Sequence, residues 1–396
     1  MYIIGKLITL IYFIILLFCI PSISQSYDFI RYDLNTIQNP QSLNNFIQSI
    51  KALELSQQQK VNIIHIGDSH IQADFFTGKM RDLLQSRFGH GGRGLIFPAK
   101  QADTHNPIDV KTSSSTQWEA KRSVFQKNDL SIGISGMSIR TTSNDASIQL
   151  RLTERFGPPP SFDKVTFFFN PDPSFNTFQA FSDKAHVQLL NQGESHATFQ
   201  ISPPLTELDV VVDPIQNGSY AELHGMILEN SLRNGILYHM AGVNGTTYFH
   251  FNRCKELLPQ MKVIAPDLII VSLGTNEALQ RKFILQDLIR EANRFMKNLK
   301  AEFPNTSVLI TTLPDAYMKK SYPNPNGEAA RKALIELATQ YGFAYWDWYE
   351  VMGGKGSMKK WVDEDLGYVD YVHFRQAGYE VQAELLYEAI VSLLGY

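Results

Sequence analysis

Cysteine is scarce in this chain: there are two among 396 residues, Cys19 and Cys254. Cys19 lies in an N-terminal apolar stretch, and if that stretch is removed, the remaining chain has no intramolecular disulfide. Cys254 lies in a helical pattern, and we interpret it as a small packed hydrophobic residue rather than a nucleophile. The ten histidines form no H-x-x-x-H or comparable pair. The sequence therefore predicts no metal site, and nothing in it calls for a cofactor.

The chain also lacks an excess of charge of either sign. Its formal net charge is -3 with a pI of about 6.4, and no basic run is interleaved with aromatic residues. This balance offers no electrostatic attraction to nucleic acid, so nucleic acid is not an expected partner. With 44% hydrophobic residues, the chain is long enough for a sizeable core and two domains.

Long apolar runs are absent except at the N-terminus. There Lys6 precedes an apolar run over residues 7–21, and small residues at alternate positions follow. This pattern predicts a signal peptide over residues 1–24 and a protein exported to the periplasm or the cell surface. Lipoprotein processing at Cys19 is disfavoured because Phe18 is bulky, while an uncleaved anchor is the alternative. If the signal is cleaved, no stable membrane span is expected.

Two patterns alternate along the rest of the chain. Near its start and again after Gly235, short apolar strands alternate with helical patterns, which predicts a parallel sheet with helices on both faces. Residues 108–232 instead show short alternating runs separated by turn residues, a pattern typical of an antiparallel β-sandwich or jelly roll. We therefore predict a three-layer α/β/α domain of flavodoxin-like type, formed by residues 25–107 and 233–396, that carries the β-rich block as an insertion.

The expected elements can be given by residue range. The strands of the parallel sheet are expected at 61–66, 236–239, 267–273, 307–312 and 344–346. Helices are expected at 43–55, 75–88, 246–258, 278–300, 328–341 and 375–394. Within the insertion, strands are expected at 130–134, 147–152, 164–169, 186–190, 198–201 and 207–212. A glycine-rich segment over 89–94 reads as a loop, and it lacks the lysine of a phosphate-binding loop.

The stretch from Val61 to His70 carries the strongest local signal. Its apolar half predicts a buried strand, Gly67-Asp68-Ser69 follows, and a helical pattern comes next. Ser69 would then stand on a strand-to-helix turn, where one turn can present an attacking oxygen and stabilise an oxyanion. Taken alone, however, Asp68-Ser69 is better interpreted as a helix N-cap.

Three further polar loops follow predicted strands or precede the last helix. They are Ala241 to Thr247, Leu273 to Glu277, and Asp370 to His373. Because sites in open parallel sheets form outside the carboxyl ends of the strands, we expect these loops to lie beside Ser69.

Together the four loops resemble the conserved blocks of the SGNH/GDSL hydrolases, which supply Ser, Gly, Asn and His in that chain order. The matching residues are Ser69, Gly245, Asn276 and His373, and the likeness covers about residues 58–90 and 235–396. Gly242 is the alternative for the glycine. Two positions depart from the usual pattern: His70 stands where many members have leucine, and Glu277 where they have aspartate.

The resemblance implies a serine esterase. His373 would take the proton from Ser69 and Asp370 would orient the imidazole, while the N–H groups of Ser69 and Gly245 and the Asn276 amide would hold the oxyanion. Other residues are expected to play lesser roles. His70 lines the site without acting as the base, Asp68 caps the helix, His65 belongs to the core, and the Arg93 loop and Tyr317 are candidate substrate contacts.

The β-rich insertion narrows the range of expected substrates. An insertion between the first and second blocks resembles the arrangement in bacterial O-acetylpeptidoglycan esterases, where a carbohydrate-binding-module-like sandwich accompanies the SGNH domain. This implies removal of O-acetyl groups from a cell-envelope glycan such as peptidoglycan, through an acyl-enzyme on Ser69. The alternatives are a glycan O-acetyltransferase, a lipase or thioesterase of the same superfamily, and a catalytically silent glycan-binding protein.

Overall fold

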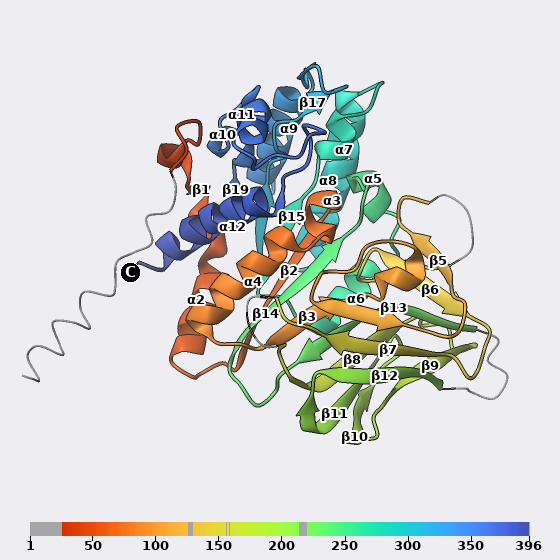
Figure 1. Cartoon of the computed structure of the whole chain (residues 1–396). Coiled ribbons are helices and arrows are strands. Elements are labelled where there is room, and N and C mark those ends of the chain that lie inside the picture. Colours follow the sequence, from red (N-terminus) through yellow and green to blue (C-terminus); the bar gives the residue numbers. More distant parts are fainter. Residues whose placement is uncertain (1–25, 126–129, 156, 158, 214–219, 396) are drawn as a thin grey trace, which may run out of the picture.

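The computed structural model describes residues 26–125, 130–155, 157, 159–213 and 220–395. The predicted signal peptide therefore lies outside the described residues. Within the described part, none of the helices has the length and apolar character needed to cross a membrane. Figure 1 shows two bodies of secondary structure side by side, a helix-covered parallel sheet and a second sheet made of strands alone.

The first sheet has the strand order β1-β19-β16-β15-β2-β14. Five of its six strands run parallel to one another, and only the edge strand β1 is antiparallel to its neighbour. Without β1, the chain order across the sheet is 2-1-3-4-5, the flavodoxin-like order. The strand bounds are β1 Ile37–Gln38, β2 Lys60–Gly67, β14 Gly235–Gly242, β15 Leu268–Ser272, β16 Ser307–Thr311 and β19 Ala344–Trp346.

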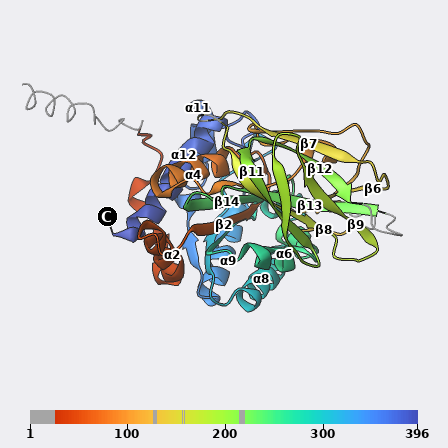
Figure 2. The same ribbon diagram turned by 90° about the horizontal axis from the view of Figure 1, so that it is seen from below.

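Helices cover both faces of this sheet. Figure 2 shows α4 and α12 on one face and α6, α8 and α9 on the other, and each face buries its own share of the apolar core. The helix bounds are α2 Asn44–Glu54, α3 Ser69–Gln72, α4 Phe75–Phe88, α5 Tyr248–Phe251, α6 Leu257–Ile264, α7 Thr275–Ala278, α8 Leu285–Glu302, α9 Gly327–Gln340, α10 Trp348–Val351, α11 Ser357–Asp363 and α12 Gln376–Val391. The predicted fold class, a parallel sheet between two helical layers, is confirmed.

The second sheet follows the path β10-β11-β8-β13-β9-β12-β7-β4, with β3, β5 and β6 added at β13. All its pairings are antiparallel except the short contact between β9 and β13. The bounds are β3 Gly92–Ile96, β4 Val110–Ser113, β5 Glu119–Arg122, β6 Met137–Thr141, β7 Ser147–Leu152, β8 Phe162–Phe169, β9 Phe175–Phe181, β10 His186–Gln192, β11 His196–Leu205, β12 Glu207–Asp213 and β13 Tyr220–Glu229. A two-stranded ribbon, β17 Tyr317–Met318 and β18 Tyr322–Pro323, completes the strands.

The glycine-rich segment is a strand rather than a loop over its second half. β3 pairs with β13 and also runs beside β14, because its glycines allow a very close approach. A Cβ on Gly94, which has φ +81°, would lie 2.4 Å from the Tyr238 carbonyl oxygen. The second sheet therefore begins at residue 92, ahead of the boundary expected at 108.

Three predicted elements differ from the structure. The helix expected at 246–258 is split into α5 and α6, because Pro259 lacks the N–H of a helix interior and suits only the first turn of α6. The helix expected at 278–300 begins at Leu285, after the single turn of α7. The strand expected at 130–134 is irregular, because its backbone N–H groups donate to side chains, as Ile134 does to Gln260.

A buried ionic network joins the two bodies. Asp74, at the start of α4, accepts hydrogen bonds from Arg81, from Arg93 on β3 and from Arg155 beyond β7. Arg93 also pairs with Asp109, at 2.9 Å between Nη2 and Oδ1. Burial opposes ionisation of Asp74, but the three guanidinium groups hold its pKa far below the ordinary value. The Asp74 carboxylate thus connects α4, in the first body, to Arg93 and Arg155 of the second body.

Candidate active site

The four loops singled out in the sequence meet at one edge of the parallel sheet. Figure 1 shows α3, α5 and α7 grouped at this edge, and each follows one of the neighbouring strands β2, β14 and β15. The turn that leads to Ser69 is tight: a Cβ on Gly67 would lie 2.2 Å from Ile71 Cγ1. Ser69 is therefore presented at the carboxyl end of β2, as the first residue of α3.

Ser69, His373 and Asp370 form one hydrogen-bonded chain. Ser69 Oγ lies 2.9 Å from His373 Nε2, and His373 Nδ1 lies 2.7 Å from Asp370 Oδ2. The His373 side chain keeps 38% of its surface exposed, so this chain of hydrogen bonds lies at the protein surface. The arrangement is that of a nucleophile, a base and a group that orients the base.

The loop that carries His373 is fixed from both sides. Asp370 Oδ1 accepts the N–H groups of Val372 and His373, at 2.9 and 3.0 Å. The next residue, Phe374, packs edge-on against Trp361 with ring centroids 4.9 Å apart. This anchoring limits the freedom of the imidazole before any substrate arrives.

The electrostatics of the pair suit a general base. Burial opposes the charge on Asp370, yet the hydrogen bonds from His373 and Val372 lower its pKa to about 2. The hydrogen bond to Asp370 raises the pKa of His373, against the opposing effect of burial. An ionised Asp370 therefore stabilises the imidazolium that forms when His373 accepts a proton.

Two backbone N–H groups are available for an oxyanion. Across the described residues, neither the N–H of Ser69 nor that of Gly245 has a hydrogen-bond acceptor. Gly245 has φ +79° and lies in an open position, where only Val124 comes within 4 Å of an added Cβ. Gly242, by contrast, is packed beneath α3, with its N–H directed at Met240 Sδ. The geometry therefore favours Gly245 over Gly242 as the oxyanion glycine.

The Asn276 amide lies beside these donors. Its Nδ2 donates to the Thr246 carbonyl oxygen at 2.9 Å and makes a longer contact of 3.4 Å with Asp68 Oδ2. The second contact is weak by its length, so that hydrogen can be redirected to an oxyanion. The structure brings together Ser69, Gly245, Asn276, Asp370 and His373, which the sequence had placed on four separate loops.

A known protein family covers three of the four loops of this site. The model of the GDSL-like Lipase/Acylhydrolase family matches residues 211–381, a range that contains Gly245, Asn276, Asp370 and His373. The part of the chain that this model covers belongs to the SGNH/GDSL hydrolase superfamily. It is accordingly a carboxylic ester hydrolase, as the resemblance had implied. Ser69 lies outside the matched range, and the fold brings it to the other three loops.

Comparison with solved structures shows how much of this SGNH hydrolase shares a fold with known proteins. A peptidoglycan O-acetylesterase matches with a TM-score of 0.75 and 21% identity, over 93% of this chain and 99% of that one. The common fold thus includes the second sheet. A lipase/acylhydrolase from Enterococcus faecalis matches with a TM-score of 0.32 and 23% identity, over 40% of this chain and 77% of that one. None of the curated proteins compared with this chain matches it in sequence.

His70, the departure in the first block, faces away from Ser69. Its Nδ1 lies 2.9 Å from the Tyr379 hydroxyl, and its ring packs 5.2 Å from that of His373. Burial, with a smaller contribution from His373, lowers the pKa of His70 to about 3. The neutral His70 ring packs against the ring of His373 and adds no positive charge that would oppose protonation of His373.

Two carboxyl groups are buried below the site of this SGNH hydrolase. Asp68 caps α3 by accepting the His70 N–H at 3.0 Å, and burial raises its pKa to about 6. Glu277 accepts the Tyr248 N–H at 2.8 Å, and burial raises its pKa to about 7. The extra methylene of Glu277, relative to the usual aspartate, lets it reach α5 and so brace the helix that follows Gly245.

Gln72 is a site residue that the sequence did not reveal. It lies on α3, three residues after Ser69, and is 2% exposed. Its Nε2 donates to Thr104 Oγ1 at 2.7 Å, and its Oε1 accepts the Asn244 N–H at 2.6 Å. Gln72 thus links α3, which carries Ser69, to the loop that carries Gly245 and to the segment between β3 and β4 of the second sheet. No motif marks it, because its partners are 32 and 172 positions away.

The remaining expectations resolve as follows. His65 is a core residue, bonded to Tyr238 and Ser272. Burial raises the pKa of the Cys254 thiol to about 12, as befits a packed residue. The expectation that Arg93 contacts substrate is wrong, because its side chain is held in the buried network with 1% of its surface exposed. Tyr317 packs against Tyr371 next to the His373 loop, with ring centroids 5.3 Å apart.

Proposed function

We propose that this SGNH hydrolase removes O-acetyl groups from a cell-envelope glycan such as peptidoglycan, as an exported enzyme that uses Ser69, His373 and Asp370. The observation that carries the proposal is the Ser69–His373–Asp370 chain of hydrogen bonds beside the unoccupied N–H groups of Ser69 and Gly245. Support for the substrate comes from the peptidoglycan O-acetylesterase whose fold, second sheet included, spans nearly all of this chain.

The proposed reaction has two half-reactions. His373 Nε2 takes the proton of Ser69 as Oγ attacks the acetyl carbonyl, and the oxyanion is held by the N–H groups of Ser69 and Gly245 and by Asn276. His373 then gives the proton to the departing sugar oxygen, which leaves an acetyl-Ser69 ester. Water, deprotonated by His373, hydrolyses this ester to acetate and free Ser69. Each oxyanion donor is worth about 3 kcal/mol of the barrier in comparable sites.

The direct test is acetate release from O-acetylated peptidoglycan and from acetylated xylan, with Ser69→Ala as the control. We expect release from peptidoglycan and a loss of about four orders of magnitude or more in the variant. Unchanged release by Ser69→Ala would refute the catalytic role of Ser69 and favour a silent binding protein.

Two further measurements separate the related activities. Nitrophenyl acetate should be hydrolysed faster than nitrophenyl octanoate, and the reverse order would indicate a lipase or thioesterase. Addition of an acceptor oligosaccharide should leave acetate as the main product, whereas acetylated oligosaccharide in its place would indicate an acetyltransferase.

A further inference from the structure

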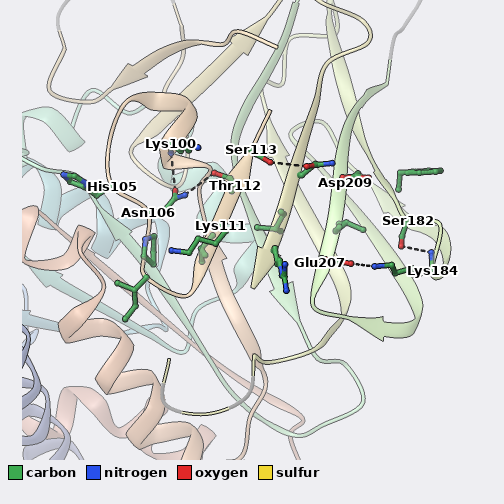
Figure 3. Close-up of a pocket in the computed structure, with 18 of the residues that line it drawn as sticks. Lys100, His105, Asn106, Lys111, Thr112, Ser113, Ser182, Lys184, Glu207 and Asp209 are labelled. Carbon is green, nitrogen blue, oxygen red and sulfur yellow. Dashed lines mark hydrogen bonds and ion pairs between the residues drawn. The ribbon is translucent and has the colours of Figure 1, made fainter. Parts of the chain in front are cut away.

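A large cavity lies on the second sheet, away from Ser69. It is a groove of about 790 Å³ between the segment 100–108 and the outer face of strands β4, β7 and β12. Figure 3 shows its side chains gathered from these elements. A cavity of this size is sufficient for a chain of sugar residues.

One end of the groove is connected to α3 by a hydrogen bond. Thr104 and His105 line that end, and Thr104 Oγ1 accepts the hydrogen bond from Gln72 on α3. The wall of the groove is therefore joined by one hydrogen bond to α3, the helix that begins at Ser69.

Two rows of residues cross the groove floor. In one row, Ser113 on β4, Gln149 on β7 and Asp209 on β12 stand opposite one another, and exposed Phe181 on β9 ends the row. The hydroxyl, amide and carboxylate groups of this row, beside an exposed aromatic ring, can hydrogen-bond the hydroxyl groups of a sugar. This row alone does not distinguish one glycan from another.

The other row is cationic toward the His105 end of the groove. Lys111 on β4 stands directly opposite Arg151 on β7, and both are exposed. Within the described ranges neither forms an ion pair, because Glu207, the residue opposite Arg151 on β12, pairs with Lys184 instead. Figure 3 shows Lys111 toward the His105 end and the Lys184–Glu207 pair at the opposite end.

This pairing of like charges has a cost for the fold. Like charges directly opposite each other on neighbouring strands destabilise a sheet by a few tenths of a kcal/mol or more. Exposed Lys100 adds a further positive charge on the same side of the groove. Glu207, opposite Arg151 on β12, offsets part of this cost, whereas Lys111 on the edge strand β4 faces only Arg151. An anionic ligand would relieve the remaining repulsion between the two cations.

We infer that this groove binds carboxylate groups of an anionic glycan through Lys111 and Arg151, while the O-acetyl group of the same strand lies at Ser69. The inference rests on the proposed function for the position of the acetyl group. It specifies the substrate class as a carboxylate-bearing glycan, such as peptidoglycan with its stem peptides, rather than a neutral acetylated polysaccharide.

The activity test uses the double variant Lys111→Gln, Arg151→Gln in the full chain. We expect the substrate concentration for half-maximal acetate release from peptidoglycan to rise about threefold to tenfold, the effect of two exposed ion pairs. Release from acetylated xylan and hydrolysis of nitrophenyl acetate should change less than about twofold. The wild-type preference for peptidoglycan should decline as ionic strength rises from about 20 to 300 mM.

The matched control is the double variant Lys184→Gln, Glu207→Gln, which removes an ion pair from the same groove, leaves the net charge unchanged and frees no carboxylate to pair with Arg151. It should leave the half-maximal concentration for peptidoglycan within about twofold of wild type. An equal rise in the two double variants would overturn the inference, because loss of any charged groove residue would then account for the effect. An equal loss on peptidoglycan and xylan would overturn it as well.

Binding separates this inference from the proposed function. Ser69→Ala should cosediment with insoluble peptidoglycan, and adding the two glutamine substitutions should reduce the bound fraction about threefold or more. If that reduction is seen although wild type releases no acetate from peptidoglycan, the proposed reaction fails and the groove inference stands. If the two substitutions leave cosedimentation unchanged, the groove inference is refuted whatever the activity.

Discussion

Gln72 offers a demanding test of how the site is held together. Gln72→Leu keeps the volume of the side chain but removes both of its hydrogen bonds, to Thr104 and to the Asn244 N–H. Asn244 directly precedes Gly245, whose N–H is an oxyanion donor in the proposed mechanism. The substitution therefore perturbs the oxyanion loop without touching Ser69, His373 or Asp370.

The size of the effect follows from the two bonds. Each contributes about 0.5–1.5 kcal/mol to the free energy of unfolding, and a buried donor left unpaired costs about 1–3 kcal/mol. Because Asn244 and Thr104 are half-buried and water can partly replace the lost partner, we expect a total loss of about 2 kcal/mol. Losing one oxyanion donor entirely costs about 10²–10³ in kcat. A displaced Gly245 should lose part of this, about tenfold to a hundredfold.

The assay is kcat for nitrophenyl acetate, together with the free energy of unfolding from urea titration. Thr104→Val is the matched variant, because it removes the bond from Gln72 to the second body and keeps the bond to Asn244. We expect it to change kcat by less than about threefold. If Gln72→Leu is destabilised but retains kcat within about threefold of wild type, Gln72 does not position the oxyanion loop. An equal loss in both variants would instead assign the effect to the Thr104 contact.

Three further predictions concern charge. Asp370→Asn should lower kcat about 10⁴-fold. In wild type, Asp370 raises the pKa of His373, so the rising limb of the profile of kcat/KM against pH is expected above pH 6.5. Because Asp370→Asn removes this partner, the limb should move to lower pH. An unmoved limb would contradict the assignment of His373 as the base. Glu277 has a raised pKa of about 7, so its contribution to stability is complete below its ordinary pKa and is lost as pH rises through about 7. Glu277→Gln should therefore gain up to about 3 kcal/mol over wild type in urea titrations at pH 8 and little at pH 5, and equal gains at both would exclude this cause. Asp74→Asn should cost about 3–5 kcal/mol in the same titration, because it leaves three guanidinium groups short of one negative charge, and a cost below about 1 kcal/mol would mean that the network is not coupled to unfolding.

The parallel sheet could be predicted from the sequence because its signals are local. β2, β15, β16 and β19 are short apolar runs followed by helical patterns, and each matches its expected range closely. The second sheet was predicted less well. Every residue of Met137–Thr141 is buried although apolar and polar residues alternate in this strand, and nearly all of β13 is buried as well. Their burial is set by distant partner strands, which the local sequence does not identify.

The candidate site, too, could be predicted from the sequence only in part. Ser69, Gly245, Asn276, Asp370 and His373 stand on loops with recognisable local spacing, so their convergence could be anticipated from strand order. Gln72, Thr104 and the Lys111–Arg151 pair have no local signal, because their significance comes from cross-strand register and contacts between the two bodies. Arg93 was misjudged for a related reason: a glycine-rich segment resembles a loop until its pairing partner β13 is known.

The path of β3 determines whether a smaller enzyme can be made from this chain. Excising residues 108–232 would remove β13, on which β3 depends, together with Asp109 and Arg155 from the buried network. The shortened protein would expose an unpaired strand edge, and edges of this kind promote aggregation. An excision that also took β3 would uncover the face of β14 against which the glycines pack. The β-rich block is therefore not a detachable module: a minimal esterase derived from this protein would need a redesigned β14 surface rather than a simple deletion.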